Sequence, residues 1–198
     1  MATKGKRTRR NIICQALQLF TRKGYFNTSI SDILDATGLT KGGLYGHFSS
    51  KEDIWYAVYD EAVKIWQGIV LKEVDEIADP LARIEQTIDN NMTHYLGAEV
   101  FDGGCFFFNM LVELSGQSSS MSRRILGGFV RFSRLLRLWL EEADHKGLLK
   151  PGLDFKAIAN FIIITVNGAA PLYTASRDPQ ILRHTVVQLR YYLQELRK

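Results

Sequence analysis

Apolar residues recur along the chain at intervals of three or four, the spacing of one face of an α-helix. No segment keeps the alternation of apolar and polar residues that indicates a half-buried strand. The pattern therefore predicts an all-α fold of about nine helices, bounded by capping residues, Gly and Pro. The approximate predicted ranges are 8–23, 28–37, 40–48, from 50 onward, 80–96, 105–115, 120–146, 154–175 and from 178 onward.

The segment GLTKGGLYGHFSSKED, residues 38–53, carries helix-start signals, yet the short helix predicted within it holds three glycines, at 42, 43 and 46. Glycine costs about 1 kcal/mol relative to Ala inside a helix, so stability does not explain them. Two short helices joined by the turn at 38–40 form a helix-turn-helix, whose second helix enters the DNA major groove. Glycines there would let the backbone approach the duplex. Leu44 and Phe48, four apart, are expected to anchor this helix to its own core.

Charge is concentrated at the N-terminal end. Residues 1–50 carry eight Lys or Arg against two Asp, a net charge of +6, whereas the whole chain has +4. A basic segment beside a near-neutral remainder predicts a polyanionic partner for that segment. Residues 4–10 fit two interpretations: a solubilising tail, or an arm in which Arg7, Arg9 and Arg10 reach the minor groove.

Residues 24–53, GYFNTSISDILDATGLTKGGLYGHFSSKED, resemble the N-terminal domain of TetR-family transcriptional regulators. The similarity rests on a Thr or Ser opening the second helix and on Ile33, Ala36, the GLT of 38–40, Gly42, Leu44-Tyr45, His47-Phe48 and Lys51-Glu52; Leu34 and Leu39 are mild departures. The resemblance implies a regulator, most often a repressor, released from a palindromic operator by a small-molecule effector. It implies phosphate contacts from Tyr45, His47 and Lys51, and base or backbone contacts from Thr28, Thr40, Lys41 and Gly42.

Each of these positions also has a simpler interpretation. The side chains of Thr28 and Thr40 could serve as helix caps, a role compatible with phosphate contact. His47 could be an ordinary surface histidine, and Tyr45 could lie at the edge of the core. Lys51 at a helix start is unfavourable for a cation, which favours a ligand or phosphate role.

The predicted division is a DNA-binding domain at 1–52 and an effector-binding and dimerisation domain at 53–198. The uncharged stretch AIANFIIITVNGAAPLYTAS, residues 157–176, is long enough to span a bilayer, but polar residues and Pro171 dilute it. Burial across a dimer interface accounts for it better, and no membrane partner is expected. The resemblance implies that the last two helices pair with those of a second copy. Four leucines would then serve both the core and that interface: Leu182, Leu189, Leu193 and Leu196.

Aromatic residues are dense around CFFFNMLVEL, residues 105–114, and predict a pocket for an apolar or aromatic effector, with ordinary packing as the alternative. The candidate lining residues are Tyr95, Phe101, Phe108, Asn109, Phe132, Trp139, Asn167 and Tyr173. Five arginines between residues 123 and 137 predict a solvated basic face, with an anionic ligand or second nucleic-acid surface as the alternative.

No carboxylate pair, metal-ligand spacing or nucleophile–base set stands out, so no catalytic residue, metal or cofactor is predicted. The basic, polar N-terminus lacks a signal-peptide pattern, and Cys14 and Cys105 fit free thiols, which favours the cytoplasm. Two alternatives stay open: an all-α enzyme or lipid-handling protein with a basic head, and a constitutive DNA-binding protein without an effector.

Overall fold

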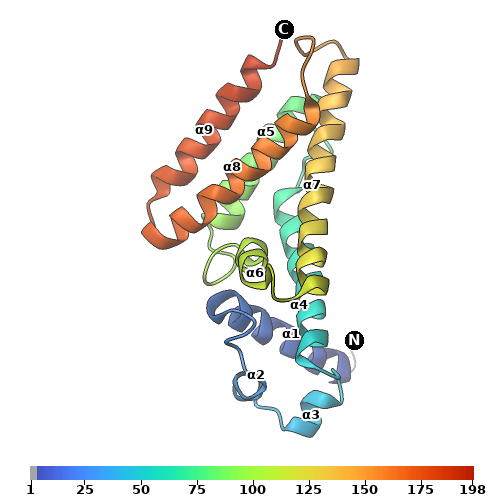
Figure 1. The fold of residues 1–198 in the computed structure, drawn as a ribbon, viewed down its shortest axis with the longest axis vertical. Coiled ribbons are helices and arrows are strands. Elements are labelled where there is room, and N and C mark those ends of the chain that lie inside the picture. The colour runs from blue at the N-terminus through green and yellow to red at the C-terminus, as the bar shows by residue number, and fades with distance from the viewer. Residues whose placement is uncertain (1–3) are drawn as a thin grey trace. The chain divides into compact units, whose positions relative to one another are not determined.

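The computed structural model describes residues 4–198, and every regular element in that range is a helix (Figure 1). This confirms the predicted all-α class. One isolated antiparallel bridge, between Leu149 and Arg197, is the sole extended pairing among the described residues. In chain order the elements are α1 (Lys4–Lys23), α2 (Ile30–Thr37), α3 (Lys41–Tyr45), α4 (Lys51–Val70), α5 (Pro80–Asp89), the π-helical segment η1 (Asn90–Leu96), α6 (Phe106–Leu114), α7 (Ser119–His145), α8 (Phe155–Ser176) and α9 (Pro179–Glu195).

Local sequence signals set most of these boundaries. Ser29 and Asp32 form a reciprocal capping box at the start of α2, and Gly38 ends that helix in the left-handed conformation, with φ 68°. Asp154 caps α8 and Asp178 caps α9, in each case by accepting a main-chain N–H with the side chain.

Three boundaries differ from the prediction. Helix α1 begins at Lys4, so the segment predicted as a tail or arm is helical through Arg7, Arg9 and Arg10. Helix α3 ends at Tyr45, because the following turn is tightened by a bond from the His47 N–H to the Leu44 carbonyl. The predicted helix 80–96 widens to π-helical geometry from Asn90 onward. The buried Asn90 amide there donates to the carbonyls of Val70 and Lys72.

The chain packs as two compact units: residues up to 65 together with 101–122, and residues 66–100 together with 123–198. In the first unit, α1 packs on α2 and α6, and the core includes Ile12, Phe20 and Leu44. In the second unit, α9 packs on α5 and α8. The predicted boundary at residue 52 concerns function and stays a prediction, and its residues 1–3 lie outside the described residues. Packing places α6 with the N-terminal helices.

Helix α8 has an open apolar face. Phe161, Ile164 and Leu172 are 47%, 71% and 61% exposed. Among residues 4–198 it is the one helix whose length and composition would suffice to cross a membrane, and 33% of its apolar window is buried. The chain itself therefore buries only part of the helix that the sequence predicts to be buried on most sides.

Candidate nucleic-acid interface

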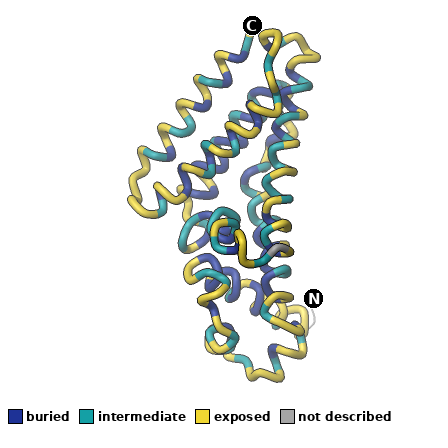
Figure 2. Tube along the Cα trace, in the orientation of Figure 1, coloured by how far each residue is buried: buried dark blue, intermediate teal, exposed yellow. Residues whose placement is uncertain are grey.

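Helix α3 has one anchored face and one open face. Leu44 and Phe48 are buried, as predicted for the residues that fix this helix to its own core. Lys41 and Gly42 are exposed, and Tyr45 is 49% exposed. In Figure 2 the segment that contains α3 is largely exposed, with short buried stretches. The helix is therefore held from one side while its other side is free to meet a partner.

The fold does not require glycine at position 42. A Cβ atom added there would meet nothing within 4 Å, and the residue has an ordinary negative φ. At Gly43 a Cβ would make only ordinary contacts, the nearest being 3.5 Å to the Thr40 hydroxyl. Since the internal packing leaves room for a side chain at Gly42, the open space lies on the outside of the protein. That geometry fits a helix whose main chain approaches an external surface closely.

Thr40 caps α3. Its hydroxyl oxygen accepts the Gly43 N–H at 3.2 Å, and its backbone is extended. The residue is exposed, and a hydroxyl that accepts one bond can still donate its own proton. Capping by Thr40 is therefore compatible with the predicted contact to DNA.

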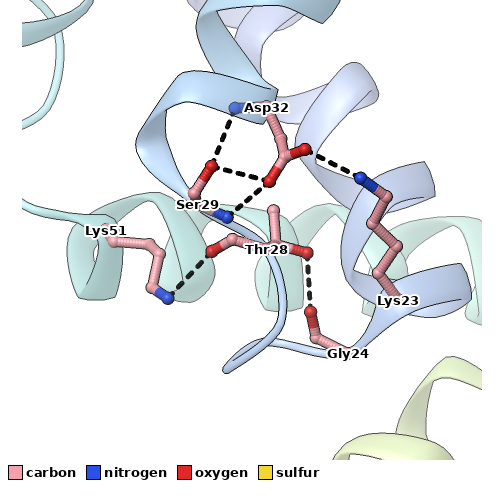
Figure 3. Close-up of polar contacts among 6 residues, drawn as sticks. All are labelled: Lys23, Gly24, Thr28, Ser29, Asp32 and Lys51. Atoms are coloured by element: carbon pink, nitrogen blue, oxygen red, sulfur yellow. Dashed lines mark hydrogen bonds and ion pairs between the residues drawn. The ribbon is translucent and has the colours of Figure 1, made fainter.

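Thr28 does not lie on this open face. Its side chain is fully buried, and its hydroxyl donates to the Gly24 carbonyl at 2.6 Å (Figure 3). The cap of α2 is Ser29 rather than Thr28. A buried hydroxyl that is already paired cannot reach a phosphate in this conformation, so the structure corrects the prediction of a side-chain DNA contact from Thr28.

Lys51 is also turned inward. Its ammonium group donates to the Thr28 carbonyl at 2.9 Å (Figure 3). It also donates to the Tyr25 carbonyl at 2.9 Å and lies 4.3 Å from the centre of the Tyr25 ring. Burial lowers the pKa of Lys51 below its usual value, and the negative charge of Glu113 opposes that shift. Two carbonyls therefore bind the cation at this helix start and help to hold the α1–α2 turn. Lys51 is partly exposed and has a third donor proton, so its phosphate contact stays a prediction.

An open groove of about 570 Å³ borders the end of α3. His47 is partly exposed there, and the Arg9 guanidinium lies 4.8 Å from the centre of the Phe48 ring. The sequence places Arg9 in a tail or arm, whereas the structure adds it to the surface beside α3. The residues that line the groove are Arg9, Tyr45, Gly46, His47, Phe48, Ser49, Asp53, Tyr56, Ala57 and Asp60.

One of the two acidic residues in the first fifty is neutralised. The Lys23 ammonium donates to the Asp32 carboxylate at 2.7 Å, and Ser29 adds further hydrogen bonds (Figure 3). These bonds, with that from Lys23 the largest contribution, hold the pKa of Asp32 well below its usual range. Asp32 is therefore engaged with its neighbours, and its charge is offset by that of Lys23.

The predicted effector residues fall in both units. Phe101, Phe108 and Asn109 belong to the first unit, and the other five belong to the second: Tyr95, Phe132, Trp139, Asn167 and Tyr173. The pocket they were assigned to stays a prediction.

Several of these residues have partners within the chain. The Asn109 amide donates to the Gly103 carbonyl and the Asn167 amide to the Ile163 carbonyl. Phe132 meets Trp66 edge to face at 4.8 Å. The Tyr173 hydroxyl donates to Glu99, a contact that no sequence pattern indicated.

The described residues form no metal site, and the arginines of α7 fit a solvated face. Within residues 4–198 no group of three or more His, Cys, Asp or Glu side chains could hold a metal ion. Of the arginines on α7, Arg137 pairs with Glu141 at 3.6 Å, whereas Arg123 and Arg134 are exposed. This arrangement matches the simpler interpretation of a solvated basic face.

Solved structures with the same fold extend over the whole chain. A transcriptional regulator from Chloroflexus aurantiacus J-10-FL superposes with a TM-score of 0.87 at 28% identity, covering 98% of each chain. AibR, solved in complex with isovaleryl coenzyme A and operator DNA, superposes with a TM-score of 0.71 at 23% identity. That match covers 92% of this chain and 97% of AibR, and it shows a likeness of fold.

Sequence comparison matches both parts of the chain. Residues 12–58 fit the family model described as bacterial regulatory proteins, tetR family, and residues 80–189 fit the one described as tetracyclin repressor-like, C-terminal domain. An uncharacterised HTH-type transcriptional regulator in the lacX 3' region of Lactococcus lactis subsp. lactis is 37% identical over 180 residues, which cover 89% of this chain and 88% of that protein. The chain therefore belongs to the TetR family of bacterial transcriptional regulators, with α2 and α3 as its helix-turn-helix.

Proposed function

We propose that this regulator is a dimeric repressor that binds a palindromic operator through α3 of each protomer and is released by a small-molecule effector. The observation that carries the proposal is the open face of α3, where a glycine that the fold does not need lies beside exposed Lys41 and Tyr45. The family consists of transcriptional regulators, which are not enzymes. The tetracyclin repressor-like C-terminal part favours repression over activation.

We assign two roles to the residues of α3 and its flanks. Thr40, Lys41 and Gly42 stand at the start of the helix, where recognition helices read base edges. Tyr45 and His47 carry hydrogen-bond donors suited to phosphate oxygens, which fix the register of the protein on the duplex without reading sequence. Thr28 is left out as a side-chain contact, because its hydroxyl is buried and already paired. Lys51, which is partly exposed, is kept as a further candidate phosphate contact.

The open apolar faces of α8 and α9 support a dimer. Besides the exposed residues of α8, α9 exposes Val187 and Tyr191, at 38% and 65%. Because α8 and α9 pack on each other, a second copy that covers both would bury these side chains and favour association through their apolar area. A two-fold dimer also matches operator symmetry, since the α3 helices of two protomers need two half-sites one helical turn or more apart.

The effector is proposed to be an apolar or aromatic small molecule. AibR shows that this fold accommodates an acyl coenzyme A and operator DNA in one complex. An effector can release DNA only if it binds one conformation more tightly than the other. Since its partner is the operator, the protein is assigned to the cytoplasm.

Two experiments test the proposal on the purified full chain. Native mass spectrometry should show a dimer and reveal any small molecule that copurifies with it. In vitro selection from random duplex DNA should enrich a palindrome. Failure to enrich any palindrome at moderate salt would contradict the proposal. Operator affinity that no cellular extract changes would instead favour a constitutive DNA-binding protein.

A further inference from the structure

The turn between α1 and α2, residues 24–28, is held by a side chain from α6. The main-chain N–H groups of Tyr25 and Phe26 donate to the two carboxylate oxygens of Glu113, each at 2.8 Å. Each oxygen accepts one N–H, so the carboxylate binds the turn at two points. Hydrogen bonds to an ionised carboxylate are about twice as strong as neutral ones. This contact joins residues that are 88 and 87 positions apart in the sequence.

Two independent features disfavour any residue other than glycine at position 24. Its φ is +87°, which strains any residue with a side chain. A Cβ atom there would also lie between 2.7 and 2.9 Å from three atoms of the Glu113 carboxyl group. Gly103, before α6, repeats the pattern, since a Cβ there would lie 2.9 Å from the Thr21 carbonyl oxygen. Segment 101–114 is therefore built to approach the end of α1 closely.

The same turn is held from its carbonyl side by α4. The Lys51 ammonium donates to the carbonyls of Tyr25 and Thr28, so an anion accepts from the N–H groups of the turn and a cation donates to its carbonyls. Ser29, the cap of α2, follows the turn directly. The direction in which α2 starts, and with it the placement of α3, is therefore set by these two charged side chains.

We propose that Glu113 is a positioning residue for DNA binding: its carboxylate fixes the α1–α2 turn so that the helix-turn-helix keeps the orientation that fits the operator. This inference rests on the proposed function and names a residue on which the operator-binding geometry depends.

The variant Glu113→Gln tests this role, because an amide presents one acceptor and one donor where two N–H groups need two acceptors. The amide NH₂ group then faces one N–H of the turn, donor against donor, and the two-point contact is lost; losing one hydrogen bond to a charged group is enough to shift an equilibrium roughly tenfold. We expect about that loss of affinity for a duplex selected with the wild-type protein. The variant also removes a negative charge, which by itself favours binding to DNA. The change in charge alone therefore cannot explain a loss of affinity in this variant.

Glu76→Gln is the matched control, since it makes the same charge change at an exposed residue of the second unit. The control should bind the selected duplex at least as tightly as the wild type. Glu113→Gln should lose affinity for the selected duplex while keeping its affinity for unrelated duplexes and its salt dependence, because the phosphate contacts themselves remain. Amide hydrogen exchange should be faster at Tyr25, Phe26 and the start of α2 in Glu113→Gln alone.

The outcomes separate this inference from the proposed function. A wild-type protein that enriches no duplex contradicts the proposed function and this inference with it. Enrichment by the wild type, together with unchanged affinity and exchange in Glu113→Gln, overturns the inference alone. Equal losses of affinity for selected and unrelated duplexes also overturn it, because they indicate that the DNA-binding helices as a whole have unfolded.

Discussion

At the residue scale, Gly42 allows DNA contact to be separated from folding. A Cβ at this position meets no other atom of the protein, so Gly42→Ala should fold normally and gain up to about 1 kcal/mol of helix stability. If the main chain approaches the duplex here, the added methyl group should lower operator affinity. The measurement pairs chemical denaturation with binding to a selected duplex.

Gly68→Ala provides the control for that prediction. Gly68 also lies inside a helix, α4, with open space around its missing Cβ, but it belongs to the second unit. It should gain similar stability and bind DNA as the wild type does. Equal affinity of Gly42→Ala, Gly68→Ala and the wild type would show that glycine at 42 serves no close approach to DNA.

Lys41 and Tyr45 are expected to differ in the kind of contact they make. Tyr45→Ala should weaken binding to all duplexes about equally, because contacts to phosphate carry no sequence information. Lys41→Ala should instead change which bases are preferred at one position of each half-site, with a cost of about 1–3 kcal/mol for the preferred base. Binding to a panel of single-base variants of the selected operator distinguishes the two. The same loss for both substitutions on every sequence would contradict this division of roles.

At the scale of elements, the start of α2 depends on a charged capping box. The pKa of Asp32 is held below its usual range by Lys23 and Ser29, so this residue stabilises the folded state when ionised. A depressed carboxyl pKa means that this stabilisation is present above the unfolded pKa of about 4 and is lost as pH falls through the lower folded value.

Asp32→Asn should therefore be less stable than the wild type at pH 7, and the difference should shrink as the solution is acidified below about pH 4. Urea denaturation at pH 7, 5, 4 and 3 measures both. Asp35→Asn serves as the control, because Asp35 is exposed on the same helix. A difference between Asp32→Asn and the wild type that stays constant with pH would contradict the electrostatic account.

The sequence predicted best where short-range physics decides. Caps at Ser29, Thr40 and Asp154 are local, and their helices begin within two residues of the expected positions. It predicted worst where a distant partner decides. The carbonyls that bind Lys51 come from residues more than twenty positions away, so no local pattern indicated these contacts. Glu113 gave no signal at all, since a lone acid at the end of an apolar helix has no pattern that links it to Gly24.

At the scale of the whole molecule, the proposed function requires two copies, and we propose that the exposed apolar side chains of the second unit form the contact. Exposed Phe161, Ile164 and Leu172 lie at intervals of three and eight on α8, so they share a broad face of that helix. A face with this much apolar surface favours covering by a partner, and repetition of the same face on two copies gives a two-fold interface.

Ile164→Glu tests the assignment, because Ile164, at 71% exposure, costs nothing to replace in the isolated chain but would place an unpaired charge in the dimer interface. We expect the dimer dissociation constant to rise at least about tenfold, measured by sedimentation at several concentrations, with secondary structure unchanged. Val112→Glu is the control, since Val112 is 62% exposed on α6 in the first unit. A dimer that survives Ile164→Glu unchanged would place the interface elsewhere. A monomer should still bind a single half-site, but more weakly than the dimer binds the operator. In a dimer, binding of one DNA-binding domain raises the effective concentration of the other at its half-site.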